Sequence, residues 1–308
     1  MRGWLGTTDG AWFRFLRGQL DLPEVNFWFP SGMRSFKAIG RGDLFFFKLK
    51  APDNAIGGFG ILERYSVLPL WLAWEAFGVR NGTPDEAALR ATIARYRRVD
   101  PRIAGELEIG CAILTQPVFF EDAAWVKVAS DWHRSIVVGK GYDLTQGEGE
   151  RIYRECMERT RDAGVNIGPV EYEGPARFGK PTLVAPRLGQ GAFRIAVTEA
   201  YERSCAVTTE HSLPVLEAAH IRPYAAGGEH SVTNGMLLRS DVHRLFDLGY
   251  VTVTPDYRVR VSEQLRERWG NGKIYRPYDG QAVAVPDRIA ERPDPLLLQW
   301  HSETVFQG

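Results

Sequence analysis

VLEAAHIRPYAAGGEHSVTNGMLLRSDVHRLFDLGY, residues 215–250, is the stretch that decides the fold of the C-terminal part of the chain. Two short apolar runs, 215–221 and 235–238, flank a loop with one proline and two adjacent glycines, which predicts two strands joined by that loop. Ser240 is a favourable N-cap, and Gly249 can end a helix in the left-handed conformation. The stretch therefore predicts strand, loop, strand and then a helix over 241–248.

This unit brings polar side chains together at defined places. His220 leaves the first predicted strand, Asn234 ends the loop, and His243 lies in the first turn of the helix. Asp247 follows His243 by four residues, so both project from one helix face. A histidine titrates near neutrality and can accept a proton from water, while imidazole and carboxylate groups can bind a divalent metal ion.

The spacing of His220, Asn234 and His243, with the flanking words EAAHI, TNGMLL and HRLFD, resembles the HNH, or ββα-metal, nuclease family. RLGQGAFR and YERSCAVT extend the resemblance over roughly residues 185–265. It implies that His220 is the general base and that Asn234 holds the loop and orients the His220 ring. It implies that His243 binds one divalent metal ion, Mg²⁺ or Mn²⁺, and Asp247 is our candidate for a second ligand.

The sequence departs from the family pattern at Ala219, where many members have a metal-binding Asp or His immediately before the base. Water, Asp247 or Glu217 could fill that place, and Glu217 could instead orient a nearby arginine. Three arginines are close enough in sequence to contact phosphates: Arg222, Arg239 and Arg244. The other two histidines of this region, His211 and His230, are predicted to be surface loop residues. The three cysteines are too far apart for a disulfide framework or a CxxC zinc site.

The first half of the chain has a different composition, because seven of the nine tryptophans precede residue 135. Apolar runs predict strands at 42–50, 54–62, 111–120 and 135–143, and helical patterns occur at 66–78, 85–98 and 147–163. This half is predicted to be a mixed α+β domain with a curved sheet. Residues 164–189 are rich in Gly and Pro and predict a linker, and a helix over 191–204 opens the second domain.

The run FWFPSGMRSFKAIGRGDLFFFKLK, with NAIGGFG and LAWEAFGVRNG after it, resembles PUA-like domains of the EVE and ASCH kind, over roughly residues 1–145. The resemblance implies a barrel-like sheet with a pocket that accepts one modified base flipped out of the DNA duplex. The candidate pocket residues are Trp28, Phe29 and Ser31 first, then Asn26, Trp71 and Asn81.

Taken together, the chain is predicted to be α+β, with a PUA-like reader domain at 1–145, a helix and linker at 146–188, and an HNH nuclease domain at 189–308. The hypothesis is a modification-dependent restriction endonuclease that recognises 5-methylcytosine or 5-hydroxymethylcytosine in double-stranded DNA and acts as a homodimer. The alternatives are a nicking or homing-type HNH enzyme, a nucleic-acid-binding protein with a decayed nuclease, and an RNA-binding first half.

Global features are compatible with this hypothesis without selecting it. The 308 residues have a formal net charge of zero, so DNA contacts must come from local basic patches. No run approaches the ~20 apolar residues of a membrane span, and the N-terminus lacks a signal pattern, so a cytoplasmic protein is expected. The last residues, 303–308, resemble an expression remnant and are left out of the fold prediction.

Overall fold

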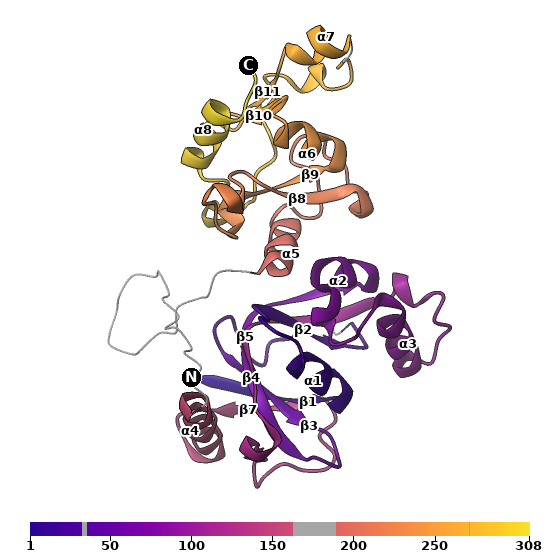
Figure 1. The fold of residues 1–308 in the computed structure, drawn as a ribbon, viewed down its shortest axis with the longest axis vertical. Helices are drawn as coiled ribbons and strands as arrows, with labels where there is room; N and C mark the ends of the chain where they lie inside the picture. The colour runs from indigo at the N-terminus through magenta and orange to yellow at the C-terminus, as the bar shows by residue number, and fades with distance from the viewer. Residues whose placement is uncertain (33–35, 163–188, 271) are drawn as a thin grey trace. The chain divides into compact units, whose positions relative to one another are not determined.

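The structure, a computed structural model, describes residues 1–32, 36–162, 189–270 and 272–308. The chain divides into two compact units, Met1–Pro186 and Arg187–Gly308 (Figure 1). The linker predicted at 164–189 lies almost entirely outside the described residues. Among the described residues, no helix has the length and apolar character needed to cross a membrane.

The N-terminal unit is built on one mixed sheet, whose strands run in the order β2-β5-β4-β3-β1-β7, with β6 paired to β4. Strands β1 and β3 are parallel, and the other pairs are antiparallel. The strands are β1 (Arg2–Thr8), β2 (Glu24–Phe29), β3 (Leu44–Leu49), β4 (Ala55–Pro69), β5 (Glu108–Phe119), β6 (Val126–Lys127) and β7 (Gly139–Asp143).

The sheet is irregular, with breaks in register between β3 and β4 and at two places between β4 and β5. Such bulges bend and twist a strand, as the predicted curved sheet requires. Two hydrophobic clusters cover the sheet, one containing Phe46 and Phe59 and the other containing Phe45 and Phe47. Among the described strands β2 and β7 end the order, so the ladder does not close into a barrel. The mixed α+β class is confirmed.

Among the residues of this unit that the structure describes, four helices accompany the sheet: α1 (Gly10–Arg17), α2 (Leu70–Phe77), α3 (Glu86–Arg97) and α4 (Gly147–Asp162). The prediction that Ser66 to Pro69 open a helix is wrong, because these residues continue β4 and pair with β5. The strand extends beyond its apolar run because β5 pairs with it as far as Pro69. Short 3₁₀ turns lie at η1 (Gly78–Asn81), η2 (Ala104–Glu106) and η3 (Asp122–Ala124).

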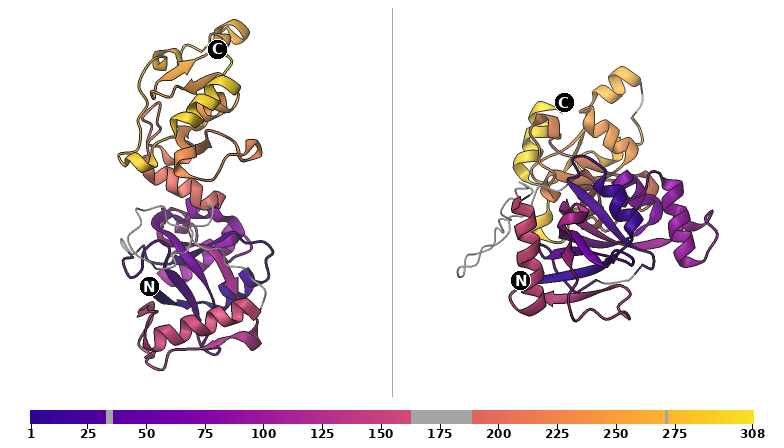
Figure 2. Two further views of the ribbon diagram at one scale, coloured as in Figure 1. Left: turned by 90° about the vertical axis from the view of Figure 1, so that its left-hand side faces the viewer. Right: turned by 60° about the horizontal axis from the view of Figure 1, so that its bottom comes forward.

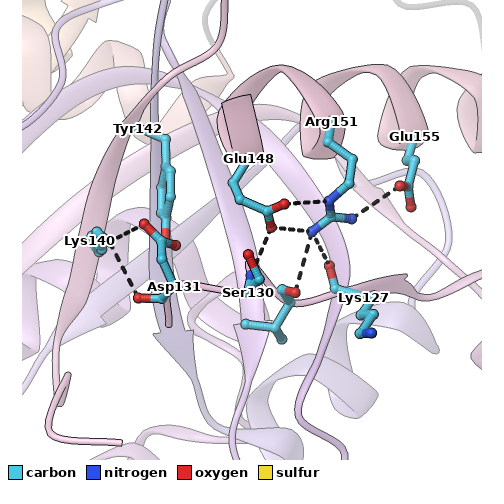
Figure 3. Close-up of polar contacts among 9 residues, drawn as sticks. Lys127, Ser130, Asp131, Lys140, Tyr142, Glu148, Arg151 and Glu155 are labelled. Carbon is cyan, nitrogen blue, oxygen red and sulfur yellow. Dashed lines mark hydrogen bonds and ion pairs between the residues drawn. The ribbon is translucent and has the colours of Figure 1, made fainter. Parts of the chain in front are cut away.

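Helix α4 packs against β6 and β7 (Figure 2). Polar contacts tie it to the segment between those strands, as Figure 3 shows. Arg151 donates to Glu148 and to the carbonyl oxygen of Lys127, and the Ser130 amide donates to Glu148 at 2.8 Å. Asp131 accepts from Lys140 and from the hydroxyl of Tyr142 on β7. These contacts give Glu148 and Arg151 of α4 a structural role.

In the described residues of the C-terminal unit, 189–270 and 272–308, there are two small two-stranded sheets and four helices. Its elements are α5 (Gln190–Ala200), β8 (Leu216–His220), β9 (Gly235–Arg239), α6 (Ser240–Asp247), β10 (Val251–Val253), β11 (Val259–Val261), α7 (Gln264–Trp269) and α8 (Pro295–Thr304), with 3₁₀ turns η4 (Leu213–Val215), η5 (Tyr224–Ala226), η6 (Val232–Asn234), η7 (Arg276–Tyr278) and η8 (Ile289–Glu291). The predicted order of strand, loop, strand and helix is therefore confirmed.

The ends of α6 match the prediction in part. Gly249 has φ +74° and follows the helix in the left-handed conformation, as expected. Ser240 is the first helical residue rather than the cap. Arg239 occupies the N-cap position, and no side chain caps the helix there.

The end of the chain packs into this unit. Helix α8 lies against β10 (Figure 2). His301 on α8 bonds to Thr252 of β10. The amide of Gln307 donates to the carbonyl oxygen of Gly249. Residues 303–308, which the sequence analysis set aside, therefore contribute contacts to the fold. All three cysteines are buried and free.

Candidate active site

The candidate site lies on β8, β9 and α6. The two strands are antiparallel, and His220 at the end of β8 pairs with Gly235 at the start of β9. Asn234 immediately precedes β9, and His243 lies in the first turns of α6. A Cβ atom on Gly235 would lie 2.4 Å from Val197 on α5, so glycine permits the close packing of α5 beneath the strands. The local fold thus gathers residues that are 23 positions apart.

The His220 ring is held by aromatic packing and by a second histidine. Phe193 on α5, which is fully buried, stacks on the ring with centroids 3.9 Å apart and planes at 16°. Nε2 of His220 lies 2.9 Å from Nδ1 of His230. Burial, helped by the nearby His230 and His243, lowers the pKa of His220 to about 4. His220 is therefore neutral at pH 7, the form that can accept a proton.

Asn234 acts on the loop and not directly on the His220 ring, so that part of the prediction is wrong. Its side-chain oxygen accepts from the Arg222 amide, and its nitrogen donates to the carbonyl oxygens of Arg222 and Glu229, all at 2.8–2.9 Å. Both amide hydrogens are thereby used on the backbone. Asn234 fixes the positions where the chain leaves His220 and approaches His230.

The loop can close this tightly because residue 228 is glycine. A Cβ atom there would lie 1.8 Å from the carbonyl oxygen of Arg222 and 2.9 Å from the amide nitrogen of Asn234. The adjacent Gly227 adopts φ +85°. The Gly-Gly pair is therefore a requirement of the loop that carries the two histidines.

His243 lies between two carboxylates. Its Nδ1 is 2.6 Å from Glu217 on β8, and its Nε2 is 3.5 Å from Asp247, one turn further along α6. Glu217 bonds to this histidine, and no bond from it to an arginine is found among the described residues, so the structure does not show the arginine-orienting role considered for it. Ala219 is fully buried, so its methyl group belongs to the core. Ala219 offers no ligand there, and Glu217 supplies a carboxylate beside His243 instead.

These donors suit a divalent ion only in part. Imidazole nitrogen and carboxylate oxygen are appropriate ligands, and all three side chains are partly exposed. The two ring nitrogens of His243, however, face different carboxylates, so the three side chains do not converge on one point where an ion could bind. Within the described ranges no group of three or more His, Cys, Asp or Glu side chains is arranged to hold a metal ion. His243 with one carboxylate fits an ion whose other ligands are water and phosphate oxygens.

The three predicted phosphate-contacting arginines differ in availability. Arg239 forms a close ion pair with Asp241 at 2.6 Å, and Arg222 donates to the Ala226 carbonyl oxygen and lies over the Trp300 ring. Arg244 is exposed on α6, and no hydrogen bond or ion pair to its side chain is found in the described part of the chain. Arg244 is thus the best placed of the three for a phosphate.

His230 is the site residue that the sequence analysis missed. It was assigned to the surface, yet it is half-buried, bonds to His220 and stacks on Tyr224 with ring planes at 6°. His211, which received the same assignment, is exposed as predicted. The one available signal was the position of His230 directly after Gly-Gly-Glu, at the point where the loop must turn back toward the first strand.

The N-terminal unit contains a pocket of about 190 Å³. Trp28 and Phe29, two of the predicted pocket residues, line it. The full lining comprises Thr7, Asp9, Trp12, Phe27, Trp28, Phe29, Pro30, Lys50, Tyr96, Val137 and Val138. Ser31 and Trp71 do not line it, since Ser31 is exposed beyond the end of β2 and Trp71 lies on α2.

Asn26 and Asn81 are buried behind the pocket and not in its wall. Asn26 donates to the side chain of Asn81 at 2.8 Å, and the Trp28 indole donates to the Asn81 carbonyl oxygen at 2.9 Å. Asn81 in turn donates to the carbonyl oxygen of Ala73. Asn81 therefore holds Trp28 in place, Asn26 supports Asn81, and neither asparagine lines the pocket.

The polar groups of the pocket form a short chain. Lys50 donates to the hydroxyl of Tyr96, which donates to Asp9 at 3.0 Å. Burial opposes ionisation of Asp9, but the Ala11 amide, Tyr96 and Lys50 together hold its pKa below its ordinary value. The Thr7 hydroxyl is buried and has no hydrogen-bond partner among the described residues. The pocket combines aromatic walls with an ionised carboxylate.

Two strands and a helix that carry a histidine, an asparagine and a second histidine define the ββα-metal class of nucleases. The family model of the HNH endonuclease matches residues 205–254, which cover β8, β9, α6 and the first strand of the following hairpin. The C-terminal unit therefore contains an HNH endonuclease domain, and the protein is a DNA endonuclease.

Solved structures give a much weaker likeness. The modification-dependent TagI restriction endonuclease is 14% identical, with 99% of this chain and 81% of that chain covered, at a TM-score of 0.28. A likeness at that score carries no argument about this chain. The comparison with curated proteins found no match.

Proposed function

We propose that this protein is a modification-dependent DNA endonuclease, in which the N-terminal unit binds a modified cytosine and the HNH domain hydrolyses a nearby phosphodiester bond. The observation that carries the proposal is the presence, in a chain with an HNH site, of an aromatic pocket that contains an ionised carboxylate. The PUA-like character of the N-terminal unit is part of this proposal.

In the HNH domain His220 is the general base. It is neutral at pH 7, it is held rigidly by Phe193, and it lies near His243. His243 would hold Mg²⁺ or Mn²⁺ with Asp247 or Glu217, and the ion would stabilise negative charge on the scissile phosphate. Arg244 contacts a neighbouring phosphate. Glu217 favours an intact nuclease over a decayed one, because it bonds to His243 although residue 219 is alanine.

In the N-terminal unit the pocket accepts a base flipped out of the duplex. Trp28 and Tyr96 provide aromatic surfaces, and Asp9 can accept a hydrogen bond from the exocyclic amino group of cytosine. Phe29 adds apolar surface for a methyl or hydroxymethyl group. Binding of a modified base at this pocket is the feature that separates the proposal from a nicking enzyme without modification dependence.

A single HNH site cuts one strand, so cleavage of both strands requires two copies. We therefore include a homodimer on double-stranded DNA in the proposal. Analytical ultracentrifugation with a modified duplex tests it, with a two-to-one complex as the expected result and a one-to-one complex as the contrary one.

The proposed function is tested by digesting one plasmid prepared in unmodified, 5-methylcytosine and 5-hydroxymethylcytosine forms, with Mg²⁺ or Mn²⁺. We expect cleavage of a modified form only, and no cleavage by His220→Ala. Equal cleavage of all forms would support the nuclease but contradict the recognition of a modified base. The second candidate function, an HNH enzyme without modification dependence, would then be favoured. An excess of RNA that abolishes binding of modified duplex would instead favour an RNA-binding first unit.

A further inference from the structure

The hydrogen bond between His220 and His230 leaves one question about the base, namely which ring nitrogen accepts the proton. Nε2 of His220 is occupied by Nδ1 of His230 at 2.9 Å. Nδ1 of His220 has no hydrogen-bond partner in the part of the chain that the structure describes. Only one proton can lie between the two bonded nitrogens, so its position decides the tautomer of His220.

We propose that His230 is a positioning residue that holds His220 in the tautomer with the proton on Nε2, so that Nδ1 is the basic atom. This inference rests on the proposed role of His220 as the general base. In the opposite arrangement His230 would donate, Nδ1 of His220 would carry the proton, and neither nitrogen of His220 could accept one from water. Only the proposed arrangement leaves His220 competent.

His230 is itself fixed well enough to play this part. Tyr224 stacks on the His230 ring, with the ring centroids 5.2 Å apart. Phe193, which stacks on His220, also packs against His230, with the ring centroids 5.7 Å apart. Asn234 holds the carbonyl oxygen of Glu229, the residue directly before His230. The asparagine of the motif therefore acts on the base through the loop and through His230.

The proton balance of the step follows from this geometry. Water gives one proton to Nδ1 of His220, and the resulting hydroxide forms a bond to phosphorus. The bond from phosphorus to the leaving oxygen breaks, and that oxygen takes a proton from solvent. The imidazolium of His220 keeps its Nε2 proton in the hydrogen bond to neutral His230, which becomes stronger because the donor is now charged.

The activity test compares His230→Ala with His230→Asn in the full-length chain under single-turnover conditions, on the plasmid form that the wild-type protein cleaves. Asn places an oxygen acceptor one bond beyond Cγ, where Nδ1 of His230 lies. We expect His230→Ala to lower the cleavage rate constant about 10- to 100-fold, the range for losing a partner that orients a metal-site histidine. DNA affinity should be unchanged, and His230→Asn should recover most of the rate.

The matched control is His211→Ala, which removes an exposed histidine from the same domain and should leave the rate unchanged. An unchanged rate in His230→Ala would overturn the proposal, and so would a loss confined to DNA affinity. If His230→Ala fails to fold, His230→Asn decides alone, since a rate as low as that of His220→Ala would contradict the positioning role.

A second readout does not depend on cleavage. Selective ¹⁵N labelling of the six histidines allows the tautomer of His220 to be read from its ring nitrogen shifts. We expect a proton on Nε2 in the wild type and in His230→Asn, and a mixture of tautomers in His230→Ala. A proton on Nδ1 in the wild type would refute the inference. A wild-type chain that cleaves no plasmid but has the Nε2 proton would count against the proposed substrate alone.

Discussion

Replacing Asn234 with alanine should destabilise the HNH domain and abolish cleavage together. The side chain is 1% exposed and makes three hydrogen bonds to the backbone of Arg222 and Glu229. Each such bond contributes about 0.5–1.5 kcal/mol, so losing three, with partial replacement by water, should cost about 2–4 kcal/mol. The cleavage rate should fall further than the loss of folded protein accounts for, because the loop also sets the position of His230.

Asn234→Asp sharpens the test because it keeps the shape of the side chain. The oxygen that accepts from the Arg222 amide remains, but an acceptor replaces the nitrogen that donates to two carbonyl oxygens. We expect Asn234→Asp to destabilise the domain at least as much as Asn234→Ala at pH 7. If the shape of the side chain were its main contribution to stability, Asn234→Asp would instead be as stable as the wild type.

The measurement is urea unfolding of the full chain, followed by hydrogen exchange of amides in β8 and β9, so that the HNH domain is observed separately from the N-terminal unit. Gln299→Ala is the control, since Gln299 is an exposed amide on α8 that bonds only to Glu303 among the described residues. A midpoint for Asn234→Ala equal to that of the control would refute the reasoning about the loop.

Three further outcomes are expected. Trp28→Ala should reduce affinity for modified duplex about tenfold or more, since stacking on one aromatic contributes about 1–3 kcal/mol, whereas Trp71→Ala, outside the pocket, should change it little in a fluorescence anisotropy titration. His243→Ala should abolish metal-dependent cleavage, while the melting temperature measured without metal should remain nearly unchanged. Cleavage equal to that of the wild type would show that His243 is not a metal ligand. Burial lowers the pKa of His301 to about 4, below its unfolded value near 6.5, so its contribution to stability is present above about pH 6.5 and is lost as pH falls toward 4. His301→Gln should flatten that dependence in calorimetry, and an unchanged slope would assign it to other groups.

Local sequence determined the part of the HNH unit that carries the site. Apolar runs, the Gly-Gly loop and Gly249 act within about 35 residues, and each restricts the backbone near its own position, so β8, β9 and α6 could be predicted. The His220, Asn234 and His243 set could be named for the same reason. In the N-terminal unit the run at 66–69 was misassigned, because its partners in β5 lie 39 to 45 residues away and the pairing overrides local preference.

Tertiary structure alone decided which side chains of different elements touch. His230 became part of the site because the loop folds back to His220, and Glu217 met His243 because β8 packs beside α6. Asn26 and Asn81 proved to lie behind the pocket because they bond to each other across 55 positions. Sequence periodicity reports which face of its own element a residue occupies, whereas a contact between elements depends on their packing, which no local pattern contains.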